Sequence, residues 1–272
     1  MIDILGRPDL QSLWLIAAGS VVGLLAAQEL GYRAYRFLQR RAAEPPEKTD
    51  GINYMLSAAL ALLGLLIAFT FSMAVDRYDA RRALVVEEAN AVGTVYLRLQ
   101  LLDEPARGVL SRDLIAYTKA RSDFLAAARN SPLLTRADAE TARTGTQFWN
   151  DLAPVLKARP GDTMSPALLT AANAMLDSAA SAQAAMNARL PDAVMTVLLV
   201  YALVSAVLMG FALGSGGRRH LAASVLLFML VSMSISLIVD LDQPRRGTVQ
   251  VSAEPFLRAA AQIEATEAAA PR

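Results

Sequence analysis

The chain has 272 residues, of which 54% are hydrophobic and 19% charged, and its mean hydropathy is +0.35. These values lie on the apolar side of an ordinary soluble domain. A formal net charge of +1 excludes a protein that holds nucleic acid by bulk electrostatics. With no cysteine and one histidine, His220, the chain has no disulfides, no thiolate chemistry and little imidazole chemistry. The composition therefore predicts a membrane protein.

Four stretches are long and apolar enough to cross a bilayer, whose hydrocarbon core of about 30 Å requires about 20 apolar helical residues. They are Leu13–Leu30, Tyr54–Val75, Ala193–Leu213 and Leu221–Val239, and the last three contain no charged residue. A basic run follows the first stretch instead of preceding it, which favours a retained anchor over a signal peptide.

Small residues recur at helical spacing within these stretches, and in lipid such rows permit helix backbones to approach closely. The rows are Gly19, Gly23 and Ala27 in the first stretch, Ser57, Ala61, Ala68 and Ser72 in the second, and Ala202, Ala206 and Gly210 in the third. In the fourth stretch, one helix face carries Ser224, Ser232 and Ser236. We expect this face to point into a bundle or an aqueous path instead of toward lipid.

Between Asp76 and Leu190 lies a polar region of 115 residues with helical periodicity. Its first apolar stripe continues the second membrane helix out of the bilayer without a break signal. Two more helices carry further stripes. The stripes run from Val85 to Leu102, from Leu110 to Leu125 and from Phe148 to Leu156.

Turn signals divide this region further. Pro105 suits the first turn of a helix. Thr135 is expected to cap the next helix, and Ser165-Pro166 to open another that runs to Leu190. No strand-like alternation of any length occurs here.

These patterns predict an all-α membrane protein: four transmembrane helices with a helical bundle inserted between the second and third. Residues 1–75 hold membrane helices one and two, 76–190 the polar helical bundle, and 191–239 membrane helices three and four. Residues 240–272 form a C-terminal tail with a short amphipathic helix that begins at Glu254.

No enzyme signature occurs: the chain has no Walker loop, dinucleotide fingerprint or nucleophile elbow. The adjacent carboxylates Glu87 and Glu88 diverge by about 100° around a helix, so we expect a solvated edge instead of a metal site. Asp240 and Asp242 are equally weak as ligands for any ion. We therefore expect no catalysis, no metal and no cofactor.

Two clusters remain. The first lies where the second membrane helix leaves the bilayer and contains Arg77, Arg81 and Arg82. These arginines either concentrate anions or form an ordinary juxtamembrane anchor. After the last membrane helix, a stop and turn include Asp242, Pro244 and Gly247.

At these clusters the chain resembles the bestrophin-like domain family of membrane proteins and, more distantly, the bestrophin anion channels. The segment from Ala68-Phe69 to Arg77-Tyr78 is similar to a bestrophin pattern of Phe followed eight residues later by Arg and an aromatic residue. Asp242-x-Pro244-x-x-Gly247 is similar to the acidic-x-Pro-Phe-Gly turn of bestrophins, and Val251-Ser252-x-x-Pro255-Phe256 matches the closer family's tail.

The resemblance implies a pentamer whose second membrane helices line a pore. Its hydrophobic neck would fall on Ala61, Leu65 and Phe69, which share one helix face. Ala61 and Leu65 replace larger or aromatic residues, and Arg245 stands where bestrophins have Phe. The tail has no counterpart of the acidic calcium clasp, so calcium gating is not implied.

Four crossings place the N-terminus, the polar region and the tail on one side of the membrane. Lys and Arg near the membrane are equally numerous on both sides. The positive-inside rule gives more weight to short loops, and it therefore places the polar region outside. The bestrophin resemblance implies the cytoplasmic side of the inner membrane, and we follow it.

The sequence supports two hypotheses. The first is an oligomeric bestrophin-like channel in contact with the lipid bilayer, for chloride or other small anions, with Arg77, Arg81 and Arg82 at one pore mouth. The alternative is a non-conducting membrane sensor or scaffold whose helical bundle binds a ligand or partner.

Overall fold

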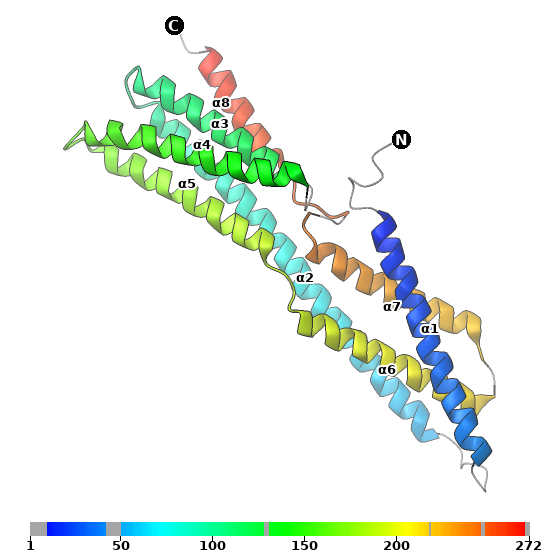
Figure 1. Cartoon of the computed structure of the whole chain (residues 1–272). Helices are drawn as coiled ribbons and strands as arrows, with labels where there is room; N and C mark the ends of the chain where they lie inside the picture. The colour runs from blue at the N-terminus through cyan, green and yellow to red at the C-terminus, as the bar shows by residue number, and fades with distance from the viewer. Residues whose placement is uncertain (1–9, 42–49, 128–130, 218, 246–247, 270–272) are drawn as a thin grey trace, which may run out of the picture. The chain divides into compact units, whose positions relative to one another are not determined.

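The computed structural model describes residues 10–41, 50–127, 131–217, 219–245 and 248–269, and this part of the chain is helical without strands (Figure 1). The helices are α1 (Leu10–Arg41), α2 (Asp50–Leu99), α3 (Ala106–Ala126), α4 (Pro132–Lys157), α5 (Met164–Asn187), α6 (Asp192–Gly216), α7 (Leu221–Asp242) and α8 (Glu254–Ala269). The predicted all-helical class is confirmed.

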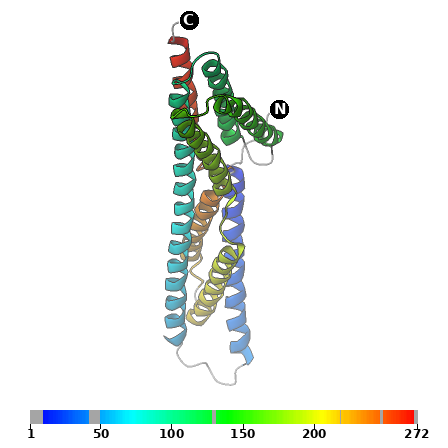
Figure 2. The same cartoon turned by 90° about the vertical axis from the view of Figure 1, so that its left-hand side faces the viewer.

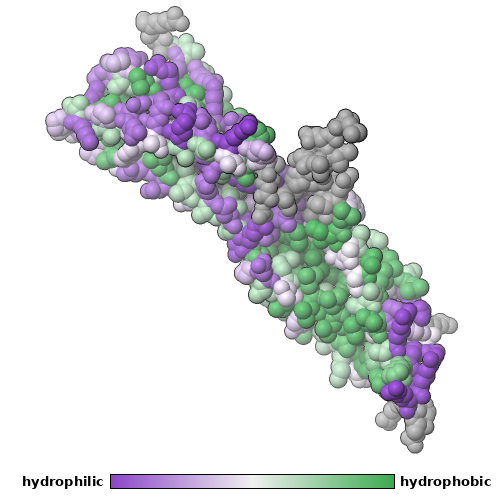
Figure 3. All heavy atoms as spheres, viewed as in Figure 1, coloured by the Kyte–Doolittle hydropathy of each residue, from purple (hydrophilic) through white to green (hydrophobic). Residues whose placement is uncertain are grey.

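The described residues divide into two compact units. We call residues 10–76 and 189–243 the apolar unit, and residues 77–188 and 244–269 the polar unit. Green, hydrophobic side chains cover α6 and much of α1 in the apolar unit, and purple ones lie at the end of α1. Purple, hydrophilic side chains dominate the surface of α3, α4 and α5 in the polar unit (Figure 3).

Four spans, the third of which takes in both α5 and α6, qualify for a membrane by length and composition, and each overlaps one of the predicted stretches. They are Trp14–Arg41, Gly51–Leu99, Met164–Gly216 and Leu221–Asp242. The prediction of four apolar spans is therefore confirmed.

Helices α1 and α6 of the apolar unit approach each other at glycines. A Cβ atom at Gly210 would lie 1.8 Å from the backbone oxygen of Gln28, and one at Gly31 would lie 2.0 Å from that of Val207. Only hydrogen fits there, so the two backbones are in direct contact. The predicted row that ends at Gly210 thus forms a helix contact, whereas a Cβ atom at Gly19 or Gly23 would meet nothing within 4 Å.

The serine face of α7 is turned inward, as the sequence predicts. Ser224 and Ser232 are buried, and Ser236 is half-buried. Exposed apolar residues such as Leu226 and Met233 cover other faces of the same helix. Polar side chains on this helix are therefore kept away from its outer surface.

Helix α2 is uninterrupted over 50 residues, as the absence of a break signal predicts (Figure 2). Its last part belongs to the polar unit and buries the stripe of Val85, Val92, Val95 and Leu99. In the polar unit this stripe joins one hydrophobic core with residues of α3, α4, α5 and α8, including Leu114, Phe148, Leu152, Met175 and Phe256.

The start of α4 differs from the prediction. Ser131, not Thr135, is the N-cap: its hydroxyl accepts a hydrogen bond from the backbone N–H of Leu134 at 3.1 Å. Pro132 then occupies the first helical position, where its fixed φ and missing N–H are tolerated. Thr135 lies inside the helix because the Ser-Pro pair begins it earlier.

The bounds of α5 also differ slightly. The helix begins at Met164, whose N–H donates to the carboxylate of Asp162 at 2.9 Å. It ends at Asn187 and not at Leu190, and the chain from Ala188 to Pro191 is non-helical. Pro191 accounts for the non-helical backbone at Leu190, because proline disfavours helical backbone at the residue before it.

Candidate functional site

The predicted neck residues lie on an exposed face of α2 in the apolar unit. Leu65 is 52% exposed and Phe69 is 60% exposed, and Ala61 is also exposed. Leu63, Thr70 and Ala74 on the other side of the helix are buried. The three predicted residues therefore form one apolar strip that no other part of the described protomer covers.

The three predicted mouth arginines of the polar unit are not equivalent. Arg82 is exposed and Arg77 is half-buried, but Arg81 is only 1% exposed. The guanidinium of Arg81 donates to the carbonyl oxygens of Ala185 at 3.1 Å and Ala188 at 2.7 Å.

These carbonyls belong to the C-terminal end of α5, where backbone oxygens lack helical partners and a positive charge is favourable. Arg81 therefore caps α5, and the structure leaves only Arg77 and Arg82 of the three for contact with a solvated ion. Arg81 lies four residues before Val85, on the face of the buried stripe, whereas Arg82 does not. Its carbonyl partners could not be identified from this spacing, because they lie more than 100 residues away.

The predicted turn after the last membrane helix is a structural stop. Asp242 is the last residue of α7, and its Oδ1 accepts a hydrogen bond from the N–H of Leu190 at 2.8 Å within the apolar unit. Pro244 is buried, and Gly247 lies outside the described residues. Asp242 thus ties the chain before α6 to the end of α7.

Arg245, which stands where bestrophins have Phe, is buried in the polar unit. Its Nη1 donates to the carbonyl oxygens of Phe124 at 2.7 Å and Ala127 at 3.2 Å, at the C-terminal end of α3. Its guanidinium also lies 4.3 Å from the centre of the Phe124 ring. The arginine therefore packs on an aromatic face while it caps a helix.

An ion pair that the sequence patterns did not predict is buried in the polar unit. Arg121 of α3 holds the Glu88 carboxylate of α2 with two hydrogen bonds, of 2.5 and 2.6 Å, and neither side chain is more than 1% exposed. The Tyr117 hydroxyl donates to the same carboxylate at 3.3 Å. Burial and the charge of Glu88 raise the pKa of Tyr117 well above its ordinary value, so this hydroxyl keeps its proton.

The expectation that Glu87 and Glu88 form a solvated edge is thus wrong for Glu88 and right for Glu87, which is exposed. Adjacent helical residues point about 100° apart, so one of them faces the core. A helical spacing of four between Tyr117 and Arg121 was the available sequence signal, but it does not identify the carboxylate they share.

A second cation lies close to this pair. The Phe124 ring has the guanidinium of Arg121 4.9 Å from its centre and that of Arg245 4.3 Å from it. Burial and the charge of Arg121 lower the pKa of Arg245. Glu88 balances the charge of Arg121 but not that of Arg245. The carbonyl oxygens at the C-terminal end of α3 stabilise the charge of Arg245.

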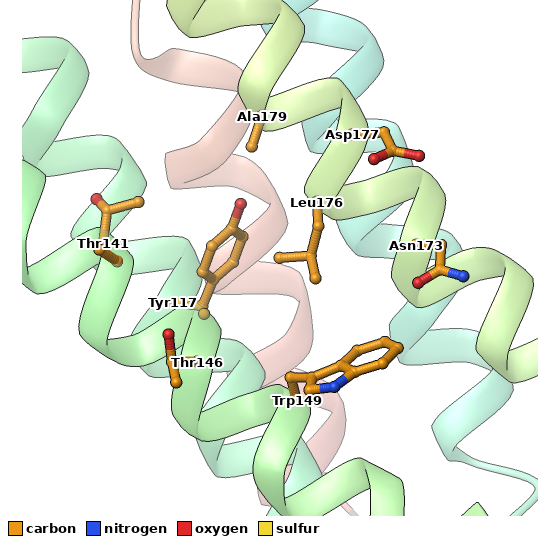
Figure 4. A pocket seen from close by; sticks show the side chains of 10 residues that line it. Tyr117, Thr141, Thr146, Trp149, Asn173, Leu176, Asp177 and Ala179 are labelled. Carbon is orange, nitrogen blue, oxygen red and sulfur yellow. The ribbon is translucent and has the colours of Figure 1, made fainter.

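The polar unit also contains a cavity of about 530 Å³ between α4 and α5, with α3 contributing one residue. Figure 4 shows apolar and polar side chains around it: Tyr117, Thr141, Thr146, Trp149, Leu176 and Asp177. Among the described residues, no group of three or more His, Cys, Asp or Glu side chains is placed to hold a metal ion.

Apolar spans and an all-helical fold define a multi-pass membrane protein, and comparison with known proteins gives its family. The model of the Bestrophin-like domain matches residues 22–256, so the chain belongs to this family. A comparison with curated protein sequences gave no match.

Solved structures share the fold. A bacterial bestrophin homologue from Klebsiella pneumoniae is 15% identical with a TM-score of 0.65, and the alignment covers 94% of this chain and 99% of the other. A point variant of a bestrophin homologue from the same organism is 16% identical with a TM-score of 0.64, covering 94% and 95%. At this identity the likeness shows the fold alone, and together with the family it supports a channel-like membrane protein.

Proposed function

We propose that this chain is one subunit of an oligomeric inner-membrane channel whose α2 helices surround the pore. The observation that supports it most directly is the uncovered strip of Ala61, Leu65 and Phe69. In a ring of subunits these strips would face the axis and form a hydrophobic neck. Membership of the bestrophin-like family and the shared fold support the same arrangement.

A neck of this kind gates by dewetting: water leaves a narrow apolar constriction, and ions cannot pass until it widens. Arg77 and Arg82 would provide positive potential at the mouth and favour small anions such as chloride. Arg81 has no part in this proposal, because its guanidinium caps α5.

The proposed arrangement in the membrane follows from the same reasoning. The four apolar spans cross the bilayer, and the helices inserted between the second and third crossings form the water-exposed bundle on the cytoplasmic side. A pentamer is the assembly that the family resemblance favours. Asp242 and Pro244 would then act as structural elements of the turn after the last crossing.

Chloride flux from liposomes that contain the purified protein tests this function. Phe69→Ala should raise the flux several-fold, because the largest neck side chain is lost. Phe71→Ala is the matched control, since Phe71 is also exposed but points about 200° away on the helix. Inserted, oligomeric protein without any flux would contradict the channel, and equal fluxes for the two variants would contradict the neck.

The cysteine-free sequence permits an independent test of the assembly. A single Phe69→Cys substitution should cross-link between subunits with a short bifunctional thiol reagent, because the neck gathers one copy from each subunit. Phe71→Cys should cross-link far less. A reversed order would contradict the proposed orientation of α2.

The cavity between α4 and α5 supports a second candidate function, a non-conducting sensor or scaffold. Its volume of about 530 Å³ and its mixed lining of Trp149, Leu176 and Asp177 are typical of small-molecule sites. Labelling of a single cysteine at the exposed Ala139 from either side of the membrane separates the two functions. A periplasmic polar unit together with absent flux would favour the sensor.

A further inference from the structure

A carboxyl group of α3 is buried in an incomplete hydrogen-bonding environment. Asp113 is 9% exposed, and its Oδ1 accepts a hydrogen bond from the side-chain amide of Gln147 on α4 at 3.0 Å. Its Oδ2 is buried and has no donor among the described residues. Asp151 follows Gln147 by four residues on α4, so its carboxyl group lies on the same helix face as the amide that contacts Asp113.

Two ionised carboxylates in this position would repel each other, and the buried Oδ2 would remain unsolvated. Both penalties are substantial inside a protein. A single proton removes both, because a protonated Oδ2 carries no charge and can donate a hydrogen bond.

The surrounding charges do not replace that proton. Arg112, the nearest cation on α3, offsets only part of the repulsion. On α4, Arg143 is bonded to Glu140 and to the amide oxygen of Gln147. The other helices packed on α3 direct their charges elsewhere: Glu88 of α2 binds Arg121 and Tyr117, and Glu264 of α8 pairs with Lys119.

We propose that Asp113 and Asp151 form a proton-binding site that joins α3 to α4 in the polar unit. This site is separate from the proposed pore, and its function does not depend on conduction. Its ligand is a proton. The alternative ligand for a pair of carboxyl groups is a divalent cation.

Burial, followed by the hydrogen bond and charge of Asp151, raises the pKa of Asp113 from 3.8 to about 6. A carboxyl group whose pKa is higher in the folded protein stabilises the fold fully below its ordinary pKa. That contribution is lost as the pH rises through the higher value. The contact between α3 and α4 is therefore tightest in acid and weakens between about pH 4 and about pH 6.

Infrared titration of the full-length protein in liposomes tests the site. The band of a protonated carboxyl group should appear as the pH falls from about 7.5 to about 5, a range in which ordinary carboxyl groups remain mostly ionised. Asp113→Asn and Asp151→Asn should each remove it. Asp123→Asn, at an exposed position on the same helix, should leave it unchanged.

Thermal unfolding provides the second measurement. Acidification over the same range should raise the Tm of the unmodified protein by about 4 °C. Asp113→Asn should show a flat profile, because its amide donates permanently where the proton would. Asp151→Asn, at a half-buried position, provides the same test if Asp113→Asn does not fold.

Two results would overturn the proposal. One is an infrared band that persists in both pair variants. The other is a rise in Tm on addition of calcium at neutral pH in the unmodified protein but not in Asp113→Asn, which would identify a divalent-cation site instead.

Discussion

The two parts of α2 differ in what they place on the surface and what they bury. Residues 50–76 leave Leu65 and Phe69 exposed, whereas residues 77–99 bury Arg81 and Glu88. One helix thus carries apolar groups outside in the first part and charged groups inside in the second. The first part is suited to apolar surroundings, whereas the second part is packed into the core of the polar unit.

The interactions that stabilise each unit internally also differ. The polar unit buries Val92, Leu99 and Phe148 away from water, which is the usual driving force of a soluble fold. In the apolar unit that driving force is weak, because lipid is as apolar as leucine. Direct backbone contact at Gly31 and Gly210 takes its place.

Breaking the buried ion pair should give the largest loss of stability. Arg121→Met leaves the Glu88 carboxylate buried without its cation, and we expect the free energy of unfolding to fall by about 3–5 kcal/mol. Denaturation of the full chain in detergent, followed by circular dichroism, measures this loss. The double variant with Glu88→Gln should recover part of it. Arg143→Met, which removes an exposed ion pair, should have no measurable effect.

Truncating apolar residues in the two parts of α2 gives the most direct comparison. Leu99→Ala should lower the free energy of unfolding by about 2–5 kcal/mol, because it leaves a cavity in the core of the polar unit. Phe69→Ala in the apolar unit should change protomer stability by less than about 0.5 kcal/mol, since its side chain is exposed. If both variants lost the same free energy of unfolding in monomeric detergent samples, the proposed difference between the two parts of α2 would be wrong.

Adding bulk at the glycine contact should have a smaller effect. Gly210→Val places atoms where the backbone of Gln28 lies, so α1 and α6 must separate, at a cost of about 1–3 kcal/mol. Thermal unfolding in detergent measures it. Gly19→Val is the matched control, because a Cβ atom at Gly19 would meet nothing within 4 Å among the described residues. A Gly210→Val variant as stable as Gly19→Val would show that the close approach is not essential.

Local patterns in the sequence were sufficient to predict the helices and their order. Runs of apolar residues, stripes at intervals of three and four, and prolines act locally, so the four apolar spans and the stripe from Val85 to Leu99 could be predicted without any tertiary contact. Where two local signals compete, as at Ser131 and Thr135, the bounds shifted by a few residues.

Tertiary packing, in contrast, selected the partners of the buried charges. Helical spacing places Glu88 and Arg81 on the face of Val85, but it does not identify the groups that they bind, which lie far away in the sequence. The same holds for Asp113, whose surroundings depend on Gln147 and Asp151 of another helix. The energy of a buried charge depends on the groups that the fold brings against it, and spacing along one helix does not contain that information.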